Sequence, residues 1–174
     1  FASAIGDNGA NEVGQVLVGD GTAAGDAVFS STVDVEVLTV NGATGASTAQ
    51  FDGVVTTAGD NAGTTGLIKV VGGNAANETA SADFNANIAA AGAMEIDGGS
   101  HASAGASVTM SGASITVTGT IDMDDVTGGS TLTFDGTVAQ SLASNIDGVG
   151  GAEGTVNISN SHGSGMTFEA EIGA

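Results

Sequence analysis

Carboxylates that gather in glycine-rich stretches are the side chains of this sequence best suited to binding chemistry. The run Asp122-Met-Asp-Asp125-Val-Thr-Gly128 matches the opening of an EF-hand-like calcium loop, without the distant Glu. The run Gly19-Asp-Gly-Thr-Ala-Ala-Gly-Asp26 matches part of a calcium-binding nonapeptide motif. Hard cations prefer carboxylate and carbonyl oxygens, and solvated acidic turns without a metal are the alternative. We expect Ca²⁺ as the one cofactor, held by Asp122, Asp124 and Asp125 and, less completely, by Asp20 and Asp26.

Other residue types that support catalysis lack suitable partners in this sequence. His101 and His162 stand in similar Ser-His-x-Ser settings, but the spacing suggests no third metal ligand, so exposed loop histidines are expected. Lys69 lies in an apolar run rather than in a phosphate-binding glycine loop. No nucleophile-elbow motif surrounds any serine. We therefore predict no catalytic residue and no enzymatic activity.

A carbohydrate-binding or polysaccharide-acting protein is the alternative function. Paired carboxylates can serve as the acid and the base of glycoside hydrolysis. The clefts of such proteins also present aromatic platforms and basic residues, and this sequence has no Tyr, Trp or Arg.

The composition excludes several other classes of function. The 174 residues include 20 Asp and Glu against one Lys, which gives a formal net charge of −19. One cation cannot neutralise a row of phosphates, so nucleic-acid binding and adhesion to an anionic membrane through a basic patch are excluded. Without Cys, disulfides and thiol chemistry are also excluded. No apolar run reaches the length of a bilayer-spanning helix, so we expect no direct membrane insertion and a single β-rich repeat domain over residues 1–174.

All six phenylalanines occupy the same position in an alternating pattern. Each has Ile or Val four residues later and a small residue midway between, as in Phe84-Asn-Ala-Asn-Ile88. Such alternation predicts a β-strand with one buried face. With Met110 in the same role, the pattern recurs every 22 to 34 residues, at Phe1, Phe29, Phe51, Phe84, Met110, Phe134 and Phe168.

A second strand type lies between these positions. It reads apolar-x-apolar and is followed closely by Gly or Asn, which tolerate the backbone conformation of a sharp corner. Its members are Val16–Val18, Leu38–Val40, Ile68–Val70, Met94–Ile96, Ile115–Val117 and Val156–Ile158.

Two one-faced strands in each repeat of about 28 residues predict an all-β fold. The expected architecture is a β-solenoid, or parallel β-helix, of about six to seven coils, with one repeat per coil. Phenylalanines from successive coils would then stack in one internal column. Strands that alternate between two sheets give the same pattern, so a two-sheet β-sandwich is the alternative fold.

The segments Thr131-Leu-Thr-Phe-Asp-Gly-Thr-Val138 and Leu38-Thr-Val-Asn-Gly42 show the repeat most plainly. This pattern resembles the degenerate repeats of bacterial autotransporter passengers, filamentous-haemagglutinin-like adhesins and β-rich S-layer proteins, and it extends over nearly the whole chain. The resemblance implies a non-catalytic, extracellular structural protein of a bacterial surface, in a filament, adhesin stalk or S-layer, with glycans or the cell surface as further contacts. One departure is that no complete calcium-binding nonapeptide occurs.

A second copy of the chain is the expected partner. A Phe-type strand opens the sequence at Phe1, and the last one ends at Ile172, without a polar or proline-bearing edge at either place. Exposed strand edges and apolar side chains favour pairing with another copy. We therefore expect a head-to-tail homopolymer, in which the negative charge keeps neighbouring filaments apart.

Overall fold

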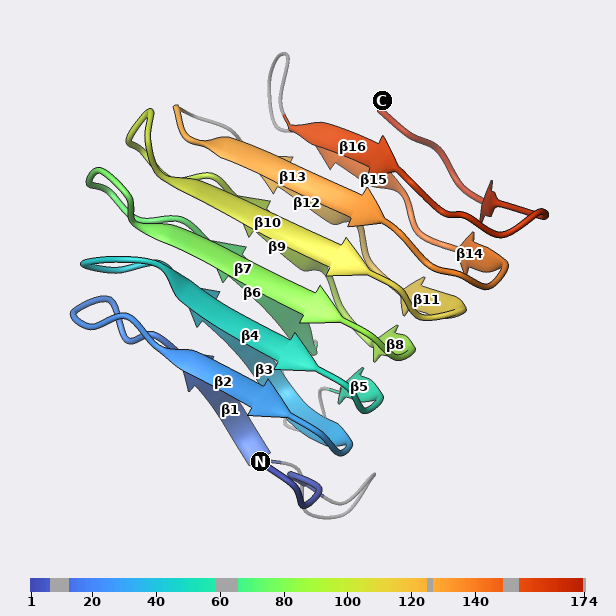
Figure 1. Ribbon diagram of the computed structural model, residues 1–174, viewed down its shortest axis with the longest axis horizontal. Helices are drawn as coiled ribbons and strands as arrows, with labels where there is room; N and C mark the ends of the chain where they lie inside the picture. Colours follow the sequence, from blue (N-terminus) through green and yellow to red (C-terminus); the bar gives the residue numbers. More distant parts are fainter. Residues whose placement is uncertain (7–12, 59–65, 125–126, 149–153, 174) are drawn as a thin grey trace.

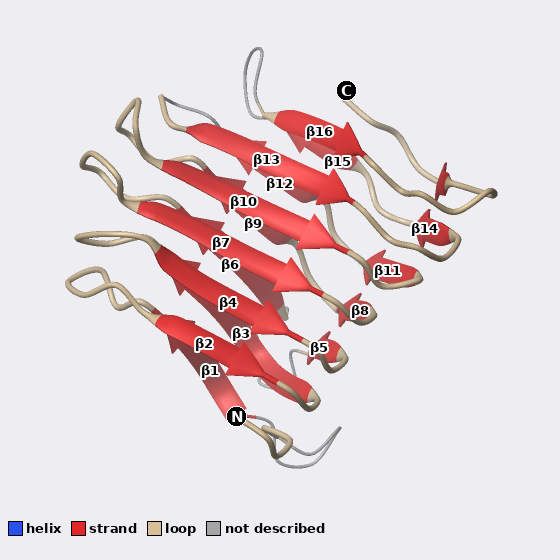
Figure 2. Cartoon of the chain, in the orientation of Figure 1, coloured by secondary structure: helices blue, strands red, loops and turns tan. Residues whose placement is uncertain are grey.

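The computed structural model describes residues 1–6, 13–58, 66–124, 127–148 and 154–173. In these residues the regular secondary structure consists of seventeen strands and no helix (Figure 2). The strands form three stacks, which the chain visits in turn as it winds along one axis (Figure 1).

The first stack contains β1 (Val13–Val18), β3 (Val33–Asn41), β6 (Leu67–Val71), β9 (Met94–Asp97), β12 (Ile121–Asp124) and β15 (Ile146–Gly148). The second contains β2 (Asp26–Phe29), β4 (Ser47–Phe51), β7 (Thr79–Phe84), β10 (Gly105–Met110), β13 (Gly129–Phe134) and β16 (Thr155–Ile158). The third contains β5 (Val55–Thr57), β8 (Ile88–Ala90), β11 (Ser114–Val117), β14 (Gln140–Leu142) and β17 (Met166–Phe168).

Parallel pairing between successive coils defines a β-solenoid. The second stack is a six-stranded sheet in the order β16-β13-β10-β7-β4-β2. The first and third stacks belong to one 11-stranded sheet, because the first residues of β3 pair with β5 and its later residues pair with β6. Six stacked strands linked in this way make about five turns, so the expected six to seven coils are reached only by counting the partial windings at the ends. The alternative of a two-sheet β-sandwich is wrong, because each strand pairs in parallel with the equivalent strand of the next coil.

An internal column of large side chains runs through the second stack. The register aligns Phe29 with Phe51, Phe51 with Phe84, Phe84 with Met110 and Met110 with Phe134. The rings of Phe29 and Phe51, and of Phe51 and Phe84, are stacked with centroids 4.9 Å apart. Burying a side chain of this size stabilises the fold by about 1.5–3 kcal/mol. We call this set the phenylalanine column; its members are Phe1, Phe29, Phe51, Phe84, Met110, Phe134 and Ile158.

Phe168 is the exception to the predicted frame. It lies on β17 in the third stack, where the register aligns it with Leu142. Its ring meets Phe134 edge-on, with centroids 5.6 Å apart and planes at 87°. The place expected for Phe168 in the phenylalanine column is taken by Ile158, which pairs with Phe134.

The second strand type was assigned correctly in the first four coils and wrongly in the last two. Ile115–Val117 belongs to the third stack and Val156–Ile158 to the second. The first stack uses Ile121 and Ile146 instead, which continue the row that begins with Val16, Leu38, Ile68 and Met94. Loops of unequal length cause this error, because they change how many residues separate one inward position from the next.

No helix in the described residues has the length and apolar character needed to cross a membrane.

Candidate functional site

The strongest calcium candidates lie on a strand rather than in a turn. Asp122 and Asp124 are on β12, on either side of the buried Met123, so both carboxylates face outward. The expectation of an EF-hand-like loop is therefore wrong for these two residues. Asp125, the third expected ligand, falls outside the described residues. Calcium binding itself stays a prediction.

Parallel register brings further carboxylates beside Asp122. It lies between Glu95 of β9 and Asp147 of β15, and Asp124 lies beside Asp97. Neighbouring strands are about 4.8 Å apart, so these charges repel one another across the outer face of the first stack. We call them the acidic ladder, with the members Glu95, Asp97, Asp122, Asp124 and Asp147.

Burial and charge shape the electrostatics of the acidic ladder. Partial burial raises the pKa of Asp122, and the charges of Asp147 and Glu95 raise it further. At one edge, Lys69 donates to Glu95 Oε2 across 2.5 Å. The side chains form a row along the sheet rather than a closed shell. Accordingly, within the described ranges, no three or more His, Cys, Asp or Glu residues are arranged to hold a metal ion.

The second calcium candidate is divided between a turn and a strand. Asp20 Oδ1 accepts hydrogen bonds from the Thr22 amide and hydroxyl, at 2.8 and 2.7 Å, and from the Ala23 amide at 2.8 Å. These bonds, the Thr22 hydroxyl above all, lower the pKa of Asp20. Asp26 lies on β2, where its Oδ1 accepts a hydrogen bond from the Thr48 hydroxyl at 2.5 Å. One oxygen of each carboxylate is thus engaged within the protein.

The two histidines adopt the same local turn. Nδ1 of His101 accepts a hydrogen bond from the Ser103 amide, and Nδ1 of His162 accepts one from the Ser164 amide, each at 3.1 Å. His162 is exposed, as expected, whereas His101 is half-buried. Because one ring nitrogen of each histidine is used in its own turn, a structural role accounts for both.

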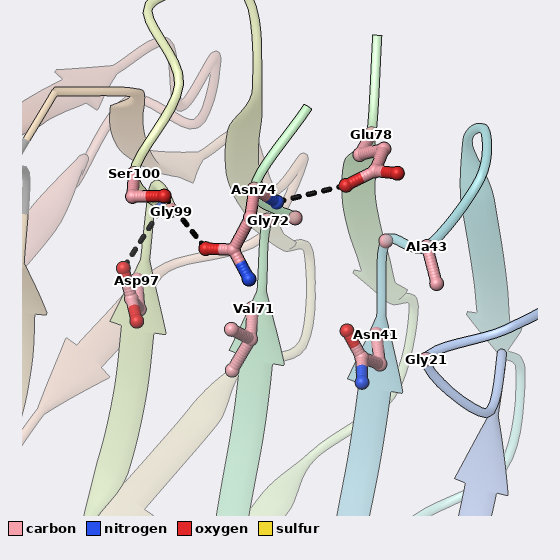
Figure 3. Close-up of a pocket in the computed structure, with 12 residues that line it drawn as sticks. Gly21, Asn41, Ala43, Val71, Gly72, Asn74, Glu78, Asp97, Gly99 and Ser100 are labelled. Atoms are coloured by element: carbon pink, nitrogen blue, oxygen red, sulfur yellow. Dashed lines mark hydrogen bonds between the residues drawn. The ribbon is translucent and has the colours of Figure 1, made fainter. Parts of the chain in front are cut away.

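A polar groove that the sequence did not reveal lies where β3, β6 and β9 end (Figure 3). Its volume is about 380 Å³. The register places Asn41, Val71 and Asp97 in one row across these three strands, with the half-buried Val71 in the middle. We call this the corner groove; its side chains come chiefly from Asn41, Val71, Asn74, Glu78, Asp97 and Ser100.

Hydrogen bonds hold the polar side chains of the corner groove in place (Figure 3). Ser100 Oγ donates to Asn74 Oδ1 at 2.7 Å, and the Gly99 amide donates to Asp97 Oδ1 at 2.7 Å. Glu78 accepts from the amides of Thr44, Asn74 and Ala75, at 2.8 to 2.9 Å. The pKa of Glu78 is consequently lowered, with the Ala75 amide as the largest cause.

Glycines form the floor of the corner groove because the coils approach too closely for any other residue. A Cβ atom at Gly72 would lie 2.5 Å from the Gly98 carbonyl oxygen. One at Gly99 would lie 2.3 Å from the Gly73 carbonyl oxygen, and the φ of Gly99 is +79°.

The repeat pattern of the sequence contains a signal for part of the corner groove. In Val40-Asn41-Gly42 and Ile96-Asp97-Gly98, a polar residue stands between the last inward side chain and the corner glycine. Stacking the second strand type in register would have aligned these residues. The contributions of Asn74, Glu78 and Ser100 come from loops, whose positions the repeat pattern does not predict.

The two ends of the solenoid expose apolar side chains. Phe1 stacks on Phe29 with one face of its ring and is 71 % exposed. At the other end, Ile158 is 58 % exposed and Ile172 is 48 % exposed. Among the described strands, β1 pairs only with β3 and β16 pairs only with β13, so each of these two strands has an open edge, whereas β2 already exchanges hydrogen bonds with the backbone of Phe1.

No protein-family model matches this chain, and no significant match is found among the curated proteins or among the solved structures.

Proposed function

We propose that this chain is a non-catalytic structural protein of a bacterial cell surface that assembles end to end, as a subunit or segment of a surface filament, adhesin stalk or S-layer. The observation that carries the proposal is the exposure of Phe1 and Ile158, the outermost members of an otherwise buried column. Apolar side chains that are buried in every inner coil favour a partner at the ends.

The end at Phe1 offers both an apolar surface and unpaired backbone. The outer face of the Phe1 ring is free to stack, and Ile5 forms a parallel bridge with Val33 that extends the third stack by one residue. Val13 and Leu17 of β1 are also exposed, at 39 and 46 %. This surface can accept another winding on all three stacks.

The opposite end of the solenoid also presents apolar side chains and strand edges to a partner. Ile158 closes the phenylalanine column, and Ile172 bridges to Ile146 and so extends the first stack. Val156 is partly buried against the core. A copy that placed its Phe1 next to Ile158 would therefore continue the phenylalanine column.

Head-to-tail addition continues the internal geometry, whereas a closed two-fold pair does not. Every strand pairing in the described chain is parallel, and only head-to-tail contact extends parallel pairing across a joint. A head-to-tail contact that does not close into a ring produces an open filament. Each copy contributes seven members to the phenylalanine column, so it should advance the filament by about 34 Å at one strand spacing per member. In a segment of a longer polypeptide, the same surfaces would receive further coils of that polypeptide.

The surface setting of the proposal rests on the resemblance of the repeat to surface proteins. A net charge of −19 fits that setting, because salt or calcium outside the cell screens the repulsion within a filament while lateral repulsion persists.

Static light scattering of the purified chain in millimolar calcium tests the assembly. We expect a mass that grows with concentration, and we expect Ile158→Lys to abolish the growth because it places a charge in the joint. Val54→Lys is the control, since Val54 is 39 % exposed and lies between β4 and β5, each of which is paired with a strand on both sides. A strict monomer at high concentration would contradict the proposal.

The second candidate function is carbohydrate binding without catalysis. The corner groove favours it, because it combines the apolar side chain of Val71 with oriented hydrogen-bonding groups.

A further inference from the structure

We propose that the corner groove binds one neutral hexose residue of a glycan. The inference adds a ligand to the structural role proposed above and depends on that role only for its biological setting. Its basis is the row formed by Asn41, Val71 and Asp97, together with Asn74 above it.

The row has the dimensions of a sugar site. Asn41 and Asp97 lie two strands apart, so about 9.6 Å separates their positions, with Val71 between them. A pyranose ring resting on the Val71 side chain would bury its apolar C–H face there. Its hydroxyl groups would then point outward toward Asn41 on one side and Asp97 on the other. The groove volume of about 380 Å³ falls in the range of small-molecule sites.

The polar groups of the groove match a pair of neighbouring hydroxyls. The Gly99 amide fixes Asp97 through Oδ1, which leaves Oδ2 to accept a hydrogen bond from a hydroxyl. Ser100 fixes Asn74 through Oδ1, which leaves the Asn74 amide group to donate two hydrogen bonds. Asn41 supplies both a donor and an acceptor on the opposite side. Acceptors and donors are thus available together, as hydroxyl groups require.

The negative charge of the groove favours a neutral sugar as the ligand. Asp97 and Glu78 place two carboxylates in the groove, and the pKa of Glu78 is lowered, so it remains ionised. Uronic acids, sulfated sugars and phosphates would be repelled. The groove contains no aromatic platform, so we expect weak binding of a single unit, with a Kd on the order of 1 mM. One groove per copy would recur along a filament and raise the avidity for a long glycan.

The test is a titration of the ¹⁵N-labelled whole chain with the methyl glycosides of glucose, galactose and mannose, followed by NMR. We expect at least one of them to give saturable shifts of the Asn41 and Asn74 side-chain amides and of the Gly72, Gly73 and Gly99 backbone amides. Asn41→Ala should weaken this binding by about tenfold without changing the melting temperature, because no hydrogen bond among the described residues uses its side chain. Asp97→Ala should weaken it as well.

Thr39→Ala is the matched control, because Thr39 lies on β3 two residues before Asn41 and outside the groove. It should leave the binding unchanged. The proposal is overturned if none of the three glycosides gives saturable shifts up to roughly 50 mM, if Asn41→Ala leaves the shifts intact, or if glucuronate produces the same shifts. Because light scattering measures assembly separately, failure of this proposal leaves the structural proposal standing, and the reverse also holds.

Discussion

The rings of Phe51 and Phe84 stack at a centroid distance of 4.9 Å with their planes 11° apart, although 33 positions separate them in the sequence. Parallel register and an internal column of identical side chains produce this contact together. Each ring is almost fully buried, so the stack links the energetics of neighbouring coils. Stability of the solenoid should therefore depend on these rings more than on any surface interaction.

The first prediction concerns Phe84. We expect Phe84→Ala to lower the free energy of unfolding by about 4 kcal/mol, because it removes a buried ring and leaves a cavity between Phe51 and Met110. Phe84→Met should cost much less, since Met110 already occupies the same column. Urea unfolding measures both values. A loss below about 1 kcal/mol for Phe84→Ala would show that the column does not stabilise the coils.

A pair of glycines provides a second prediction. A Cβ atom at Gly98 would lie 2.2 Å from the Gly128 carbonyl oxygen, whereas one at Gly129 would have no atom within 4 Å. We expect Gly98→Ala to destabilise the fold by about 3 kcal/mol. Gly129→Ala should be neutral or should stabilise it by about 0.5 kcal/mol, because alanine restricts the unfolded chain. Equal effects of the two substitutions on urea unfolding would contradict the close stacking at this corner.

The fold class was predictable because the inward residues keep a constant period where loops are short. Phe84 is followed four residues later by Ile88, as in the earlier coils, and both residues are buried as expected. The later coils depart from this spacing: Leu142 follows Phe134 by eight residues, and Phe168 follows Ile158 by ten. Sequence alone gives no sign of which residues of a long loop point inward.

Gln140 shows why the alternating pattern fails in the later coils. It is 2 % exposed, and it donates to the carbonyls of Met110 and Gly112 while accepting from the Gly136 amide and from Asn160. Gln140 therefore occupies an inward position of β14, whereas Val138, which the pattern places inward four residues after Phe134, is 44 % exposed. The corner groove was missed for a related reason, because its residues meet only after the strands pair.

The acidic ladder predicts a dependence of stability on pH. The pKa of Asp122 in the folded protein is raised above its ordinary value of 3.8. The stability that its proton provides is therefore complete below that value and is lost as the pH rises through the raised pKa. The Asn side chain of the Asp122→Asn variant cannot ionise, so we expect the variant to have a higher urea midpoint than the wild type at pH 7. When the pH falls toward about 4, the variant should gain less stability than the wild type.

Asp20 supplies the matched control with the opposite sign. Its pKa is lowered by hydrogen bonds, chiefly from Thr22, so its contribution is present above the ordinary value and is lost as the pH falls through the lowered pKa. Asp20→Asn should lower the urea midpoint at pH 7. A lower midpoint for Asp122→Asn at the same pH would contradict the repulsion inferred for the acidic ladder.

Calcium should stabilise the folded chain through the same ladder. A cation that binds only the native state adds about 1.4 kcal/mol when its concentration is ten times its Kd. We expect millimolar calcium to raise the melting temperature more than NaCl of equal ionic strength, and we expect the double variant Asp122→Asn, Asp124→Asn to lose this difference. Glu169→Gln is the control, since Glu169 is exposed and lies outside the ladder. Equal effects of calcium on the wild type and the double variant would show that Asp122 and Asp124 are not calcium ligands.

Electron microscopy of the assembled chain measures the proposed end-to-end growth most directly. Seven column members per copy predict unbranched filaments with an axial subunit repeat of about 34 Å and a strand spacing of about 4.8 Å along the axis. Isolated particles the size of one chain, or closed dimers, would contradict the proposed assembly.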